Sequence, residues 1–281
     1  MRGKQSEMRG ESIMSDVILS TILEFLEERY PLRLAEPWDN VGLLIGDTEL
    51  PIKRIMTCLT VTPEVCREAI EGNADLIVTH HPFPFKPVTK ITTETVRGRM
   101  IWDVMTSKIA VYSPHTAHDS APDGINQQIA KRLGLQQITT LFEDKNETTF
   151  SNEGTGRIGS LPEPMLFKDL VNKAREAFDE KVMTYIGDPE KEIRTVAIGC
   201  GSAGSFLEQA ILRGADVFVI GESKFHTYLE AQQQGIGLII PGHYASERFA
   251  MERMAELIQS KFEEIHVWAS KNEADPIKFA T

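Results

Sequence analysis

Short apolar runs alternate along this chain with stretches in which apolar residues recur at helical spacing. The runs are rich in Val and Ile and are too short to form buried helices, so they predict strands. Helical stretches between successive strands indicate crossover connections, and such connections join parallel strands. The pattern predicts an α/β fold of mostly parallel sheets flanked by helices.

The first half of the chain opens with an amphipathic helix that runs from Ser15, a candidate N-cap, to about Tyr30. After it we expect strands at 41–45, 55–61, 76–79 and 109–112, and helices at 63–72, 95–107 and 123–134. In the second half we expect strands at 157–161, 194–199, 217–220, 237–240 and 265–268, and helices at 165–178, 203–213, 224–234 and 244–261. The two halves therefore follow the same order of strand and helix.

The sequence also indicates an internal duplication. Two pairs of segments align: residues 74–78 with 215–219, and residues 110–115 with 238–243. The second alignment sets Asp119 on Glu247, so each half has a strand followed by His-x-x-x-acid. Chance similarity between apolar strands is the alternative explanation. A duplication predicts two similar α/β lobes.

These patterns divide the chain into parts. We expect the polar residues 1–14 to be a flexible tail, 15–142 to form the first lobe and 143–281 to form the second. A strand from the C-terminal end is expected to cross into the first lobe. Residues 141–156 show little periodicity and are the candidate linker.

Composition limits the class of protein. A formal net charge of -11 argues against binding nucleic acid through a broad basic surface and favours small-molecule or metal chemistry. The three cysteines do not describe a disulfide framework. No apolar run reaches the ~18 residues of a membrane span, and the polar N-terminal residues lack the apolar core of a signal peptide. We therefore expect a cytoplasmic protein that does not associate with membranes.

The pair His80 and His81 follows directly after the strand expected at 76–79, at the strand end where α/β enzymes keep their chemistry. Neighbouring side chains on an extended chain point to opposite sides. One strand end can therefore offer an imidazole to each of two metal ions. A capping pair that is hydrogen-bonded to backbone is the alternative.

Two His-acid pairs occur further along the chain. His243 and Glu247 lie four residues apart where a helix begins, so they face the same side; alternatively, Glu247 only favours the helix dipole. Asp119 follows His115 by four residues after the strand expected at 109–112. An Asx cap of the following turn is the alternative for Asp119.

Together these segments supply three imidazoles and two carboxylates, from His80, His81, Asp119, His243 and Glu247. This donor set suits Zn, Mn, Fe or Co better than Ca. Five ligands for one ion leave little open coordination, whereas five ligands for two ions leave room for water. The sequence therefore favours two divalent metal ions bridged by a carboxylate, a centre that activates water for hydrolysis.

Other polar residues at strand ends are further candidates. Glu222, Lys224 and His226 follow the strand expected at 217–220 and are candidates for substrate contacts or proton transfer. Asp39 and Asn40 either shape a turn or lie near the site. Trp38 is expected to fill the core.

A glycine-rich turn follows the strand expected at 194–199. Gly199, Gly201 and Gly204 form either an anion-holding loop at a helix start or a closely packed turn.

Four separated segments resemble the NIF-three-like family, whose members are also named GTP cyclohydrolase I type 2 homologues. They are EPWDNVGLLIG at 36–46, THHP at 79–82, His115-Thr116 with Asp119, and Gly242-His243-Tyr244 with Glu247. The resemblance covers nearly the whole chain after about residue 14. It implies two similar α/β lobes with the metals in the cleft between them, assembled as a toroidal homohexamer.

The resemblance also implies which residues share an ion. His81 and Asp119 would bind one metal, His80 and His243 the other, and Glu247 would bridge both. Longer relatives carry an inserted domain, for which the short interval 143–193 leaves no room.

His118 departs from the family pattern, because relatives often have an apolar or amide residue there. An additional ligand, a proton shuttle and a solvent-facing side chain are the alternatives for His118. The role of His115 stays open.

The family name implies hydrolytic opening of the guanine imidazole ring of GTP by a metal-activated water, with release of formate. Nothing in the residues identifies guanine, and hydrolysis of a phosphoester would suit the same centre. We therefore expect a metal-dependent hydrolase of a nucleotide or related small molecule. The alternative is a non-catalytic protein for metal binding, metal delivery or interaction.

Overall fold

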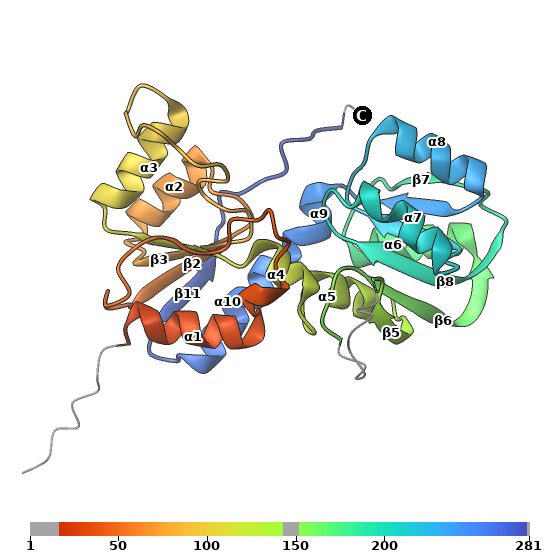
Figure 1. Ribbon diagram of the computed structural model, residues 1–281, viewed down its shortest axis with the longest axis horizontal. Coiled ribbons are helices and arrows are strands. Elements are labelled where there is room, and N and C mark those ends of the chain that lie inside the picture. Colours follow the sequence, from red (N-terminus) through yellow and green to blue (C-terminus); the bar gives the residue numbers. More distant parts are fainter. Residues whose placement is uncertain (1–16, 143–151, 280–281) are drawn as a thin grey trace, which may run out of the picture.

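The structure is a computed structural model in which residues 17–142 and 152–279 are described. Two sheets, each flanked by helices, lie one after the other along the longest axis of the molecule (Figure 1). This arrangement confirms the mixed α/β class expected from the alternating sequence pattern. The tail expected at 1–14, the candidate cap Ser15 and most of the expected linker lie outside the described residues.

The first sheet has the strand order β1-β4-β3-β2-β11. Its strands are β1 (Gly42–Ile45), β4 (Ala110–Ser113), β3 (Leu76–Thr79), β2 (Arg54–Cys58) and β11 (His266–Ala269). The pairs are parallel except that β1 runs antiparallel to β4. β3 and β4 are buried along their whole length, as parallel strands covered on both faces are.

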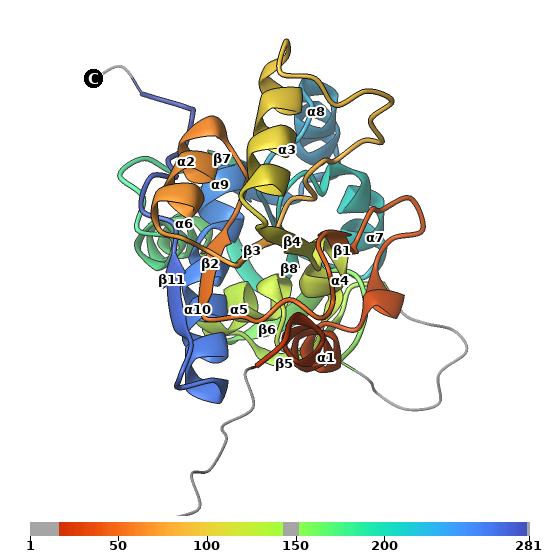
Figure 2. The same cartoon turned by 90° about the vertical axis from the view of Figure 1, so that its left-hand side faces the viewer.

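Alternate residues of β3 face different helices, as the two-residue period of a strand requires. Leu76 and Val78 belong to an apolar cluster that includes α1 (Leu19–Arg29) and α10 (Phe249–Lys261). Ile77 belongs to a second cluster, formed with α2 (Pro63–Glu71) and α3 (Val96–Thr106). One helix pair therefore covers each face, as Figure 2 also shows.

The second sheet has the strand order β5-β6-β8-β9-β10-β7. Its strands are β5 (Gln136–Thr140), β6 (Arg157–Leu166), β8 (Glu192–Gly199), β9 (Val217–Ile220), β10 (Gly237–Ile240) and β7 (Thr184–Ile186). One face is covered by helices α5 (Ile125–Arg132) and α6 (Phe167–Ala177). The other face is covered by α7 (Leu207–Leu212) and α8 (Phe225–Gln234). A 3-10 turn (Gly204–Phe206) precedes α7.

The expectation of mostly parallel strands fails in this second sheet. Only β9 pairs in parallel with both its neighbours, and the other described pairs, at β5, β6 and β7, are antiparallel. The sequence pattern missed β5 and β7 because these edge strands are short and largely exposed, without an apolar run. The two edge strands that lack a sequence signal, together with the antiparallel pairing of β6 with β8, account for the error.

The sheets do not divide the chain at residue 142. β5 precedes that position but belongs to the second sheet, and β11, from the far end of the chain, joins the first sheet beside β2. One apolar cluster runs on beneath both sheets and includes α1, α5, α6 and α10. Within the described residues, no helix combines the length and apolar character needed to cross a bilayer.

Two short helices lie between the sheets. α4 (His115–Ser120) follows β4, and α9 (His243–Glu247) follows β10 (Figure 1). The helix expected at 244–261 is thus two helices, α9 and α10, which meet at Arg248. Both short helices begin where a parallel strand ends, so their side chains reach the space between the lobes.

Arg157, at the start of β6, has a fully buried side chain. Its guanidinium donates hydrogen bonds to Gln127 Oε1 and to the carbonyl oxygens of Ser120, Ala121, Asn152, Gly154 and Gly156. Among the described residues no carboxylate pairs with it. Burial lowers the pKa of Arg157 to about 10, so it stays protonated at neutral pH. Arg157 therefore fastens the end of α4 to the start of the second sheet.

We predict that Arg157→Met lowers the free energy of unfolding by about 3 kcal/mol or more, because several buried carbonyl groups lose their donor. Urea denaturation measures the change. Arg253→Met is the control, since Arg253 is exposed and pairs only with the exposed Glu256; it should cost at most ~1 kcal/mol. Equal loss of stability in the two variants would contradict this role for Arg157.

Candidate metal centre

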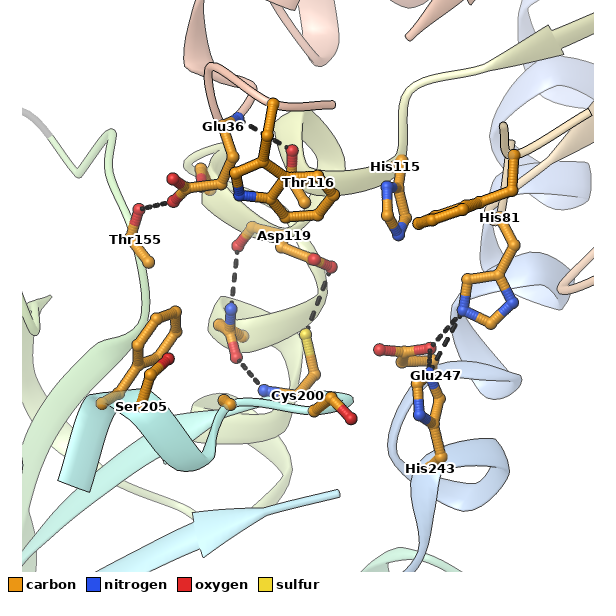
Figure 3. A pocket seen from close by; sticks show the side chains of 17 residues that line it. Glu36, His81, His115, Thr116, Asp119, Thr155, Cys200, Ser205, His243 and Glu247 are labelled. Carbon is orange, nitrogen blue, oxygen red and sulfur yellow. Dashed lines mark hydrogen bonds and ion pairs between the residues drawn. The ribbon is translucent and has the colours of Figure 1, made fainter. Parts of the chain in front are cut away.

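A cavity of about 440 Å³ lies between the two lobes and is lined by side chains from both (Figure 3). Four of the five predicted metal ligands line it: His81, Asp119, His243 and Glu247. The fifth, His80, is buried directly behind them. The structure thus brings together all five side chains, which come from the end of β3, from α4 and from α9.

Three donor atoms converge at one side of this group. Glu247 Oε2 lies 3.0 Å from His243 Nε2 and 3.2 Å from His81 Nε2, and the two imidazole nitrogens are 3.2 Å apart. Glu247 Oε2 is buried, and its geometry forms no hydrogen bond with any described residue. Two imidazole nitrogens and a carboxylate oxygen that converge on one point are typical of a metal site.

His80 stands at the other side of Glu247. Its Nε2 lies 3.7 Å from both Asp119 Oδ1 and Glu247 Oε2. Both ring nitrogens are buried without a hydrogen-bond partner among the described residues. Burial lowers the pKa of His80 well below its usual value, so the ring is neutral and offers a lone pair. A buried polar group without a partner is costly, and a metal ion would satisfy it.

These distances group the side chains differently from the ion sharing that the family resemblance implies. His81 stands with His243, whereas His80 stands with Asp119, and Glu247 touches both pairs. The reason is local: successive side chains at the end of β3 diverge, His80 toward α4 and His81 toward α9. The side chains fit a metal site, and which ion each histidine binds stays a prediction.

The charged side chains of this group shift the pKa values of one another. Burial, together with the neighbouring Glu247, raises the pKa of Asp119 to about 7. Burial would also raise the pKa of Glu247, but His80, His243 and His81 outweigh it and lower that pKa. In His243, Glu247 and Glu222 outweigh burial and raise the pKa to about 9. The centre therefore keeps a buried carboxylate ionised, which favours a cation.

Hydrogen bonds hold the far side of each exposed imidazole. His81 Nδ1 lies 2.7 Å from Thr60 Oγ1, and His243 Nδ1 lies 3.0 Å from Glu222 Oε1. Ligand histidines usually have their second nitrogen held in this way, because it fixes the tautomer and the ring orientation. Glu222, a catalytic candidate from the sequence, thus orients His243. Neither Lys224 nor His226 lines the cavity.

The C-terminal segment holds the loop that carries Thr60. Glu273 accepts hydrogen bonds from the backbone N–H groups of Leu59 (2.9 Å) and Thr60 (2.6 Å), and its carboxylate lies 2.7 Å from Arg248 Nε. The sequence analysis missed Glu273 and Thr60. Neither belongs to a motif, and only the tertiary fold brings residues so far apart in the chain together.

Cys200 was also missed, although it lines the cavity. Its Sγ lies 3.2 Å from Asp119 Oδ1, and its backbone N–H donates to Asn126 Oδ1 at 2.7 Å. Burial, with Asp119 and Glu247 nearby, raises the pKa of Cys200 well above its usual value, so it is a thiol that donates to Asp119.

Two expectations about aromatic residues need correction. His118 does not face solvent: it is fully buried, packs on Tyr30 with ring centroids 4.3 Å apart, and does not line the cavity. Burial lowers the pKa of His118 to about 3, which argues against a proton shuttle. Trp38 does not fill the core; it is 65% exposed at the cavity, with its ring edge-to-face on His115.

The glycine-rich turn after β8 is explained by close packing. A Cβ on Gly201 would collide with Glu247 Oε1, and Gly201 has a φ of +59°. Gly199 and Gly204 are likewise crowded, by Ala203 and Ser223. The glycine at 201 therefore lets the second lobe approach the carboxylate at the centre of the group.

Comparisons with known proteins identify the family of the chain. Residues 17–276 match the family model described as Duf34/NIF3 (NGG1p interacting factor 3). A Clostridium acetobutylicum protein named GTP cyclohydrolase 1 type 2 homolog is 34% identical over 262 residues, 92% of this chain and 97% of the relative. NIF3-like protein 1 of Drosophila melanogaster is 31% identical over 275 residues, 96% of this chain and 92% of the relative. These matches confirm the resemblance expected from the four motifs.

A solved structure shows the same fold. A Bacillus cereus protein described as related to NIF3 superposes with a TM-score of 0.86 at 23% identity, covering 94% of this chain and all of that one.

We predict that Gly201→Ala lowers the affinity for Zn²⁺ by ~10-fold or more, the effect typical of displacing a ligand's support. Gly214→Ala is a matched control, because Gly214 has a similar φ of +71° but open space where the Cβ would be. Both variants lose ~1 kcal/mol of stability from the left-handed backbone. Zinc titration of both variants separates this shared cost from the clash with Glu247. Equal zinc affinity in Gly201→Ala and Gly214→Ala would refute the effect of the clash on metal binding.

Proposed function

The chain belongs to the Duf34/NIF3 family, and we propose that it is a metal-dependent hydrolase with two divalent ions between its lobes. In this proposal His80, His81, Asp119, His243 and Glu247 would hold the two ions. The distances group His80 with Asp119 and His81 with His243, and Glu247 contacts both pairs. Zn, Mn, Fe and Co suit these donors. The substrate is a nucleotide or a related small molecule that enters the cavity.

The convergence of three imidazoles on Glu247 Oε2 carries the proposal. The Nε2 atoms of His243, His81 and His80 lie 3.0, 3.2 and 3.7 Å from that oxygen. When bound, two divalent ions supply Lewis acidity and make water a nucleophile near neutral pH.

The chain's own residues would orient this centre and shape the cavity. Glu222 and Thr60 fix the two exposed imidazoles, and the buried wall behind His80 excludes water from that side. Trp38 and Phe85 line the cavity with large exposed aromatic faces, which suit a planar ring in a substrate.

The charges lining the cavity bear on the family name. No Lys or Arg lines it among the described residues. A phosphate group that enters would therefore meet the metal ions and not a cationic side chain. We accordingly keep both ring opening of GTP, which the name of the Clostridium relative suggests, and phosphoester hydrolysis as reactions to test.

We also propose that the lobes arose by internal duplication. β3 (Leu76–Thr79) and β9 (Val217–Ile220) are separated by 141 residues, and the helices before them, α2 and α7, lie at the same offset. Both strands pair in parallel with the strand on either side, β2 and β4 or β8 and β10. The homohexamer implied by the family stays a prediction.

We predict that Glu247→Gln, which keeps the shape but removes the charge, abolishes binding of at least one ion and lowers any hydrolase activity at least ~100-fold. Metal analysis of the purified protein identifies the ion, and an activity screen with that ion covers GTP and a panel of phosphoesters. Glu256→Gln, an exposed change on α10, is the control and should match the unmodified protein.

Two outcomes would count against the proposal in different ways. A protein that takes up no divalent ion would remove its basis. A protein that binds two ions but turns over no substrate, while Glu247→Gln loses only the metal, would favour the alternative of a non-catalytic metal-binding or metal-delivery protein.

A further inference from the structure

We propose that His115 is a sixth metal ligand of this centre, held in place by Asp39. The inference rests on the metal binding in the proposed function but not on the hydrolysis. His115 follows β4 as the first residue of α4 and lines the cavity (Figure 3). Its free ring nitrogen faces the same space as the imidazoles of His80 and His81.

One of the two ring nitrogens of His115 is already hydrogen-bonded. Its Nδ1 lies 2.8 Å from both Oδ1 and Oδ2 of Asp39. The Asp39 side chain is buried and also accepts hydrogen bonds from the backbone N–H and the hydroxyl of Thr116. Because an ionised carboxylate only accepts hydrogen bonds, Nδ1 carries the proton and Nε2 has a free lone pair.

The free nitrogen is close to the predicted ligands. One ring nitrogen each from His80, His81 and His115 lies within 4.8 Å of the other two. The His115 ring centroid is 5.1 Å from that of His80 and 5.6 Å from that of His81. A metal ion bound by either imidazole would therefore lie within reach of His115.

The ring of His115 is held in the same way as those of the other two histidines that line the cavity. In His81, His243 and His115 alike, an oxygen atom holds Nδ1 and leaves Nε2 for the cavity. Of the three, His115 has the strongest such support, a buried carboxylate contacted through both its oxygens. A carboxylate behind the imidazole is the usual support of a metal-binding histidine.

The backbone at His115 supports a functional role. Its φ of +30° is unusual for a residue with a side chain, and such conformations cost about 1–3 kcal/mol. Strain of this kind concentrates at binding and catalytic sites. Here it accompanies a sharp change of direction between β4 and α4, where the ring of His115 meets Asp39.

The test is a titration of the full chain with Co²⁺, whose absorption spectrum reports the number and type of ligands. We expect His115→Gln to weaken one of the two ions by ~10–100-fold and to change the Co²⁺ spectrum, as loss of a nitrogen ligand should. Asp39→Asn should weaken the same ion by up to ~10-fold, because it disturbs the support but keeps the ligand. The control is His266→Gln, an exposed histidine on β11, which should leave both ions and the spectrum unchanged.

The outcomes separate this inference from the proposed function. Two ions bound with unchanged affinity and spectrum in His115→Gln would overturn the inference and leave the proposed function standing. No uptake of Co²⁺ by the unmodified protein would overturn both. If circular dichroism shows that His115→Gln does not fold, Asp39→Asn decides: unchanged affinity for both ions then overturns the inference.

Discussion

The buried carboxylate of Glu247 is the contact on which the arrangement of this cleft depends. It stands between His80 and His81, which directly follow β3, and His243, which begins α9. It therefore joins the two lobes at one point. Those imidazoles hold the pKa of the carboxyl below its usual value in spite of burial. A buried charge is tolerated only when partners compensate it, so these partners have to stay in place.

The support of those partners comes from distant parts of the chain. Glu273 fixes the loop that carries Thr60, and Thr60 in turn holds the His81 ring. On the opposite wall, Arg157 ties the end of α4 to the second sheet and so fixes the segment that carries Asp119. Each support is a network of hydrogen bonds that holds a segment bearing a predicted ligand in place. Rigid placement of ligands is what a metal centre requires.

The sequence predicted more of the centre than of its surroundings. β3, β9 and β10 lie where the apolar runs predicted them. His80 and His81, which directly follow β3, lie at the cleft as expected. The assignment of these histidines to the two ions stays a prediction, because it depends on how the side chains diverge at a strand end, which no spacing rule fixes. Trp38 was misplaced because an aromatic residue in a turn is apolar in the sequence whether it fills a core or lines a cavity. Arg157 and Glu273 had no signal in the sequence, since most of their partners are backbone groups.

Binding of metal and closure of the cleft should be linked. The unpartnered nitrogens of His80 and the unbonded oxygen of Glu247 lie where residues of both lobes meet. Folding without a cation leaves the nitrogens of His80 desolvated and without a partner, a cost that a bound ion would remove. An ion that binds only the closed arrangement stabilises it by an amount that grows with ion concentration. The same side chains that prepare the centre for chemistry would then hold the two lobes together.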